Sequence, residues 1–172
     1  MGGQDEDMIP ELINCFDRTQ KYMRVQVADL SDEEMALQPP GAPNHAAWTL
    51  GHVIHSCEAI AGELGIKPWL GDEWDSLFGY GSSAEKVACS GRWSKDALLA
   101  SVAEANDRLR EALLTTDESR LSDPLPDERI REVLPTTGDA LLQILCAHAA
   151  FHAGQLSAWR RAIGRKPIGV FI

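Results

Sequence analysis

Apolar residues recur every three or four positions in four stretches of this chain, which is the spacing of a helix with one buried face. The first stretch runs from about Ile9 to Leu30, and the second from about His45 to Leu64. The third runs from Ser94 to about Thr115, and the fourth from Thr136 to about Ile163. The pattern therefore predicts four amphipathic helices.

Residues that favour helix ends stand at the borders of these stretches. Residues 31–34 (SDEE) match a capping box. In this motif the serine side chain accepts the backbone N–H of the glutamate, and the glutamate side chain accepts the backbone N–H of the serine. N-caps are expected at three further helix starts, namely Asn44, Ser94 and Thr136. Two glycines that follow helical stretches are typical C-terminal stops, namely Gly65 and Gly164.

Two long connections separate the predicted helices. Residues 65–93 are rich in glycine and tryptophan, and residues 123–135 hold three prolines and some extended character. A long connection often covers a site. The aromatic residues of the 65–93 connection therefore form either a lid over the site or a separate cluster under the loop, and they are Trp69, Trp74 and Phe78. With no clear strand pattern elsewhere, we predict an all-α protein of one domain over residues 1–172. Its architecture is a four-helix bundle with long connections between helices two and three and between helices three and four.

Composition narrows the expected partners. The chain has 172 residues and a net charge of −10, which argues against general nucleic-acid or membrane-surface binding. Residues 1–8 (MGGQDEDM) hold no apolar signal-peptide core, and no apolar stretch is long enough for a membrane span. We therefore expect a cytoplasmic protein whose four cysteines, none of them in a CxxC motif, are reduced and mostly buried.

All five histidines fall in the second and fourth predicted helices. His148 and His152 are four residues apart, so their side chains lie about 40° apart on one helix face and both rings can reach one point. Imidazole is a common ligand for zinc, nickel, copper and iron. Two buried imidazoles that hydrogen-bond to each other or to the backbone are the more common arrangement for this spacing. A metal site needs a third ligand from another helix.

The second predicted helix offers that ligand. His52 lies near its middle, whereas His45 lies about 10 Å away at its start. His55 is three residues after His52 and about 60° round the helix, so it is either a neighbour in the pocket or an alternative ligand. His52 is therefore the best candidate for the third ligand. Three protein ligands leave coordination positions open, as catalytic rather than structural sites do.

Two segments of the chain resemble one known family. Residues 48–58 (WTLGHVIHSCE) are similar to the first ligand-bearing helix of the DinB-like (DinB/YfiT) superfamily, and residues 148–164 (HAAFHAGQLSAWRRAIG) are similar to its last helix. The resemblance implies a four-helix bundle that holds a divalent metal through three side chains, His52, His148 and His152. It also implies diverse roles, among them transferases or isomerases that depend on a low-molecular-weight thiol. His55 maps onto no ligand of the family.

Other side chains near the predicted site admit two interpretations each. Trp48, one turn before the ligand of the second helix, either walls the pocket or fills the core. Gln155 lies on the ligand face of the fourth helix, where its amide can orient a ligand or a bound water. Glu58 is expected to point away from the ligand face. Arg160 and Arg161 either bind an acidic substrate or favour the helix C-terminus through its dipole.

Three neutral imidazoles leave the charge of a bound metal intact, so the metal would lower the pKa of a bound water or thiol. We therefore predict a metal-dependent enzyme of the thiol-dependent S-transferase or hydrolase type, acting on a small molecule with zinc, nickel or iron as cofactor. The alternative is a non-catalytic metal-binding or stress-response module of the same fold. No catalytic base is assigned, and a homodimer is left open.

Overall fold

The computed structural model describes residues 8–169, so the expectation about a signal sequence at residues 1–7 lies outside the described residues. Within this range every regular element is a helix, and an isolated bridge between Pro124 and Thr136 is the one β-type pairing. The prediction of an all-α protein is confirmed. No helix of the described range has the length and apolarity that a membrane span needs.

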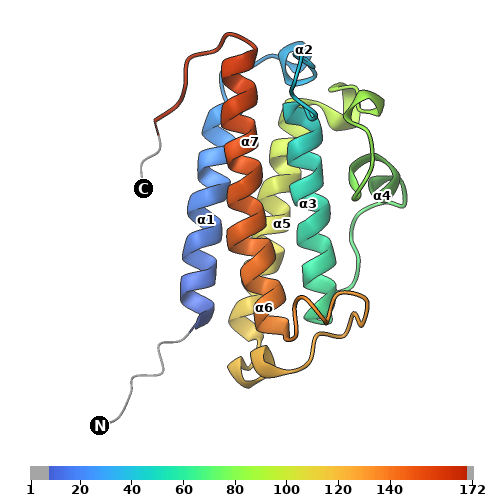
Figure 1. The fold of residues 1–172 in the computed structure, drawn as a ribbon, viewed down its shortest axis with the longest axis vertical. Coiled ribbons are helices and arrows are strands. Elements are labelled where there is room, and N and C mark those ends of the chain that lie inside the picture. The colour runs from blue at the N-terminus through green and yellow to red at the C-terminus, as the bar shows by residue number, and fades with distance from the viewer. Residues whose placement is uncertain (1–7, 170–172) are drawn as a thin grey trace.

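Three long α-helices and one composite helix lie side by side (Figure 1). The three are α1 (Met8–Val27), α3 (Ala46–Glu63) and α5 (Lys95–Thr115). The composite helix covers residues 137–162. Its last part, α7 (Ala149–Ala162), packs against α1 and α3, and both of these also pack against α5. Each predicted stretch thus forms a helix, although α1 ends at Val27 rather than near Leu30.

Three of the four predicted helix starts have the expected cap. Ser31 forms a capping box at the short helix α2 (Asp32–Met35), and Ser94 and Thr136 cap α5 and α6. The prediction of Asn44 as the cap of α3 was wrong, because the cap is His45. Its Nδ1 accepts the N–H of Trp48 at 3.2 Å, while its Nε2 lies 2.8 Å from the Ala84 carbonyl. An imidazole between one donor and one acceptor serves as a cap as a serine does.

The composite helix is not a regular α-helix over its whole length. It begins as α6 (Thr137–Leu141), continues as a π-helical segment, η4 (Leu142–His148), and ends as α7. Leu141, the last residue of α6, and Leu145 of η4 are both fully buried. π-Helical turns are uncommon and are frequently found at functional sites. The segment ends at His148, so the irregular turn adjoins one of the predicted ligands.

The connection after α3 lies along that helix and holds the short helices α4 (Glu73–Phe78), η1 (Ala84–Lys86) and η2 (Gly91–Trp93) (Figure 1). Glu58 fastens its start by accepting the backbone N–H groups of Trp69 and Leu70, each at 2.5 Å. Of the two interpretations of its aromatic residues, the structure favours the cluster for Trp74 and Phe78, whereas Trp69 lies against the Arg108 guanidinium. The rings of Trp74, Phe78 and Trp93 pack with centroids 4.9–5.1 Å apart.

The second connection begins with η3 (Glu118–Ser122) and continues through a series of turns over residues 128–133. The Leu125 N–H bonds to the Pro135 carbonyl at 3.0 Å beside the Pro124–Thr136 bridge. This pairing closes residues 125–135 into a loop whose base holds the start of α6. The extended character expected here is therefore confined to the two ends of the loop.

Arg160 ties α7 to the end of α1. Its side chain is only 3% exposed, and its guanidinium donates to the Asp29 carboxylate at 2.6 and 2.8 Å and to the Gln26 carbonyl at 2.7 Å. The neighbouring Arg161 is exposed and donates to Ser157 at 3.1 Å. Arg160 therefore holds two helices together rather than binding an acidic substrate.

Candidate metal centre

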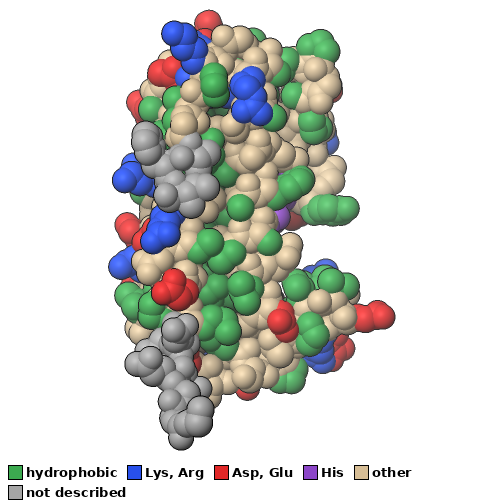
Figure 2. Space-filling view, turned by 60° about the vertical axis from the view of Figure 1, so that its left-hand side comes forward, with side chains coloured by type: hydrophobic (Ala, Val, Ile, Leu, Met, Phe, Trp, Pro, Cys, Tyr) green, Lys and Arg blue, Asp and Glu red, His purple; other side chains and the backbone are tan. Residues whose placement is uncertain are grey.

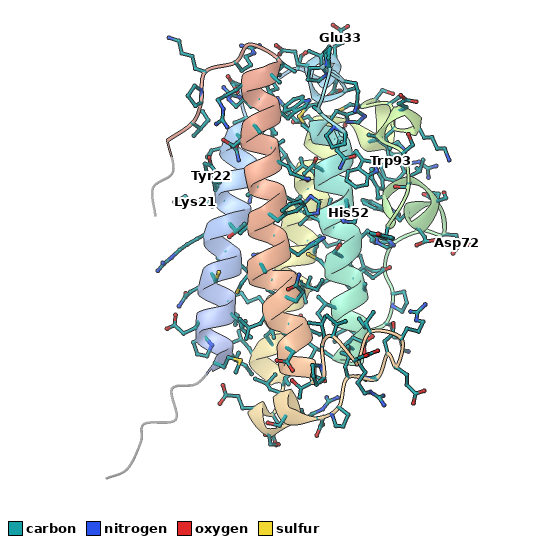
Figure 3. The ribbon with its side chains drawn as sticks, viewed as in Figure 1. Lys21, Tyr22, Glu33, His52, Asp72 and Trp93 are labelled. Carbon is teal, nitrogen blue, oxygen red and sulfur yellow. The ribbon has the colours of Figure 1, made fainter. Side chains whose placement is uncertain are left out.

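Three histidine rings meet between α3 and the composite helix. The Nε2 atom of His148, at the end of η4, lies 3.2 Å from Nε2 of His52 on α3 and 3.1 Å from Nε2 of His152 on α7. The candidate ligand atoms all lie within 4.8 Å of one another. Figure 3 shows the His52 side chain near the middle of α3, directed toward α7. The structure thus brings together the three histidines predicted from the sequence.

The His52 ring is held by the connection that follows α3. Its Nδ1 lies 2.6 Å from the carbonyl oxygen of Phe78, the last residue of α4. A carbonyl only accepts hydrogen bonds, so Nδ1 carries the proton and Nε2 keeps its lone pair for a ligand role. Trp48 stacks on the other side of the ring, with centroids 4.7 Å apart and planes 8° apart, and its Nε1 donates to Ser82 at 2.9 Å. Trp48 therefore both fills the core and fixes the ligand ring.

A glycine permits this contact between α3 and α4. A Cβ atom at Gly51 would lie 2.2 Å from ring carbons of Phe78, far below any van der Waals distance. Gly51 immediately precedes His52, so the residue that lets α4 approach also adjoins the residue that α4 orients. The motif WTLGH contributes its tryptophan, glycine and histidine to one arrangement.

His152 and Gln155 supply a test of whether the three rings fit a metal. The Nδ1 atom of His152 and the Oε1 atom of Gln155 are both buried, and neither has a hydrogen-bond partner among the described residues. A histidine that binds metal through Nε2 carries its proton on Nδ1 and usually donates it to a nearby acceptor. Gln155 is one turn away on the same helix and offers such an acceptor. The donor set and these two unpaired atoms fit a metal bound at Nε2 of His152.

Burial keeps the three imidazoles neutral. It lowers the pKa of His148 and His152 to about 4, helped by the neighbouring histidines of the group. Burial also lowers the pKa of His52, although the bond to the Phe78 carbonyl opposes this shift. Neutral imidazole is the form that binds metals, so the site is ready to accept a cation at neutral pH.

The remaining candidates lie outside the group of three. His55 lines the adjacent cleft and pairs with Asp75 of α4, with Nε2 and Oδ1 3.3 Å apart. Burial raises the pKa of the Cys57 and Cys146 thiols to about 12, so neither is an activated nucleophile. All four cysteines are free thiols.

A cleft of about 420 Å³ opens beside the three histidines, and both His52 and His148 line it. Figure 2 shows a hollow in the surface here, with a histidine side chain in purple at its edge. Sequence reasoning missed several lining residues, among them Ser56, Ile60, Glu63, Tyr80 and Asp127. The first three follow His52 at helical spacing, so the period of α3 could have revealed them. Tyr80 and Asp127 come from the connections, whose course has no such periodic signal.

Comparison with known proteins now places the chain. The model of the DinB superfamily matches residues 16–156. The chain belongs to the DinB superfamily. The three histidines of this DinB chain all fall inside the matched residues, as does the whole connection after α3.

The DinB fold is also seen in a solved structure. The chain is similar to a conserved protein from Enterococcus faecalis, with a TM-score of 0.74 and 20% sequence identity over 91% of this chain and 97% of that chain. At this identity the similarity supports the fold and not the reaction. Among curated proteins, none matches this sequence.

Proposed function

We propose that this DinB-superfamily protein is a metal-dependent enzyme acting on a small molecule, with a divalent metal held by Nε2 of His52, His148 and His152. The observation that carries the proposal is that these neutral rings, two of them buried and His148 half-buried, converge at the end of an open cleft that two of them line. The pairwise packing of the long helices supports the four-helix bundle expected of the family. The net charge of −10 supports a small-molecule partner over nucleic acid or membrane.

When bound, the metal supplies Lewis-acid chemistry that lowers the pKa of a coordinated water or thiol. Two reactions fit such a site. In S-transfer, a thiol sulfur forms a bond to an electrophilic carbon, the leaving group departs with the bonding electron pair, and the thiol proton goes to a base or to water. In hydrolysis, water takes the place of the thiol. The apolar walls of the cleft suit the first reaction, because they exclude competing water from the nucleophile.

The residues around the three ligands have distinct proposed roles. Phe78 and Trp48 fix the His52 ring, and Gln155 is placed to accept the Nδ1 proton of His152 once a metal takes its Nε2. His55 lines the cleft outside the ligand group and is backed by Asp75, as imidazoles that accept protons in catalysis often are. We assign it the proton-accepting role.

The competing interpretation is a non-catalytic metal-binding or stress-response module. A purely structural metal is enclosed by four protein ligands, whereas three ligands beside an open cleft leave room for a substrate. The cleft therefore favours an enzyme. Cytoplasmic localisation and a homodimer stay predictions.

Metal analysis tests the proposal. Protein stripped with a chelator and then dialysed against zinc, nickel or iron(II) in turn should retain about one metal per chain. His52→Ala, His148→Ala and His152→Ala should each lower metal affinity by at least about tenfold. His55→Ala is the matched control, because it removes an imidazole of the same cleft and should keep the metal.

Activity distinguishes the enzyme from the module. The loaded protein is offered alkylating electrophiles with a panel of small thiols, and separately a panel of esters. His55→Ala should retain the metal and lose most of the turnover. A wild-type protein that holds no stoichiometric metal would exclude the proposal, and full metal with no turnover in either panel would favour the module.

A further inference from the structure

The cleft runs lengthwise along α3, away from the candidate metal centre. Four of its lining residues follow His52 at intervals of 4, 7, 8 and 11 positions, so they share its helix face: Ser56, Ala59, Ile60 and Glu63. Eleven residues at the rise of an α-helix span about 16 Å. The cleft therefore has the histidines at one end and Glu63 at the other.

The opposite wall is apolar along the same distance. Ile144 and Ala140 precede His148 at four-residue steps on the composite helix and line the cleft with it. The second connection adds three more aliphatic side chains, Leu125, Ile130 and Leu134. Tyr80 projects from the first connection at the edge, with its side chain fully exposed. A molecule in this cleft would be bounded by hydrocarbon between its two ends.

The charges at the far end are negative and only partly compensated. Asp127 accepts three hydrogen bonds of 2.5–3.1 Å from the Arg129 side chain, and its pKa is lowered to about 2. The Arg129 side chain is mostly exposed and forms an ion pair with Asp127. The negative charge of Glu63 is close enough to contribute to raising the pKa of Arg129. The Oε2 atom of Glu63 is buried and has no hydrogen-bond partner among residues 8–169. No lysine or arginine of the described range lines the cleft.

We propose that the cleft binds a molecule with an apolar body and a cationic N–H donor, such as an ammonium group, at the end remote from its reactive group. The Glu63 carboxylate, which lines the cleft and whose buried Oε2 has no partner among residues 8–169, accepts the hydrogen bond of that cation. This inference deepens the proposed function, since it names the substrate class of the same cleft. A carboxylate at the same end of the molecule meets Glu63 and Asp127 and is disfavoured.

Binding without metal is the first arm of the test. Octylammonium, octanol and octanoate are titrated into metal-free protein by calorimetry at pH 7. The ammonium compound should bind about tenfold or more tightly than the carboxylate, with the alcohol in between. Glu63→Gln should remove most of this preference, and Glu63→Lys should reverse it.

A matched variant separates the cleft from the overall charge of the protein. Glu85→Gln removes the same charge from an exposed position on η1, outside the cleft, and should leave the preference unchanged. Circular dichroism melts of all variants confirm that each one folds. Equal binding of the three compounds, tighter binding of octanoate, or loss of the preference in Glu85→Gln would overturn the inference.

Binding with metal is the second arm. Alkanethiols of matched length that end in an amine, an alcohol or a carboxylate are titrated into cobalt(II)-loaded protein, and the thiolate-to-cobalt absorption band is followed. The aminothiol should give the band at the lowest concentration. A missing band together with a preserved ammonium preference in the metal-free protein would sink the proposed metal chemistry and leave the cleft inference standing.

Discussion

Gly51 illustrates how one residue can decide the geometry of the candidate site. It is the helix position that the Phe78 ring covers, and the Phe78 carbonyl orients the ring of the next residue, His52. Alanine normally stabilises a helix relative to glycine. At this position the packing cost outweighs that gain, because the added Cβ would lie 2.2 Å from the ring.

We therefore expect Gly51→Ala to lower the free energy of unfolding by about 1–3 kcal/mol and to weaken metal binding by roughly tenfold or more. Gly62→Ala is the control, because a Cβ there meets nothing within 4 Å on the same helix. It should leave metal affinity unchanged and should slightly raise stability. Urea unfolding and metal titration of the two variants provide the comparison, and equal behaviour would contradict this account of Gly51.

The lowered pKa values of His148 and His152 predict how the stability of the metal-free protein depends on pH. Their pKa is about 4 in the folded protein and 6.5 in the unfolded chain. Between these values the unfolded chain binds protons that the folded protein does not, so stability is lost as the pH falls from 6.5 toward 4. The free energy of unfolding of the wild type and of the His148→Gln, His152→Gln double variant is measured with urea across pH. Plotted against pH, the two should differ in slope only between pH 4 and 6.5. Parallel profiles would count against the shifts.

At the scale of elements, the connection after α3 is a working part of the site. It supplies the carbonyl that orients His52, the partner of His55 and the exposed tyrosine at the edge of the cleft. Its start is fastened by Glu58, whose carboxylate bonds to the backbone of Trp69 and Leu70. This attachment should contribute to stability without acting on the metal.

Glu58→Ala should lower the free energy of unfolding by about 1–3 kcal/mol, because two backbone N–H groups lose a charged acceptor. Glu58→Gln keeps an acceptor oxygen and should cost less. Metal affinity of both variants should stay within a factor of about two to three of wild type, since no atom of the group of three is moved. A large loss of metal affinity would show that the start of the connection also positions His52.

At the scale of the whole molecule, one buried arginine joins the first and the last of the long helices. Arg160 of α7 bonds to Asp29 and to the Gln26 carbonyl at the end of α1, so one guanidinium closes the packing between the first and last helices. The hydrogen bonds from Arg160, together with its positive charge, lower the pKa of Asp29. This use of its donors explains why Arg160 is buried although arginine is among the most polar residues.

Arg160→Ala should therefore destabilise the protein by about 2 kcal/mol, a value below that for a fully enclosed pair because the Asp29 side chain is half exposed. The adjacent exposed Arg161→Ala should change stability by no more than about 0.5 kcal/mol. Thermal unfolding of both variants tests this contrast. If the two melted alike, Arg160 would have no special part in joining the two helices.

The sequence by itself determined the helices and most of their caps, because periodicity and capping are local properties. It also determined the pairing of His148 with His152, since four residues of helix bring two rings to one point. Tertiary structure alone decided the π-helical turn before His148, the Phe78 carbonyl on His52, the histidine cap of α3 and the unpaired oxygen of Glu63. The Phe78 carbonyl on His52 and the Ala84 carbonyl on His45 come from residues 26 and 39 positions away, and a periodic pattern holds no information about such contacts.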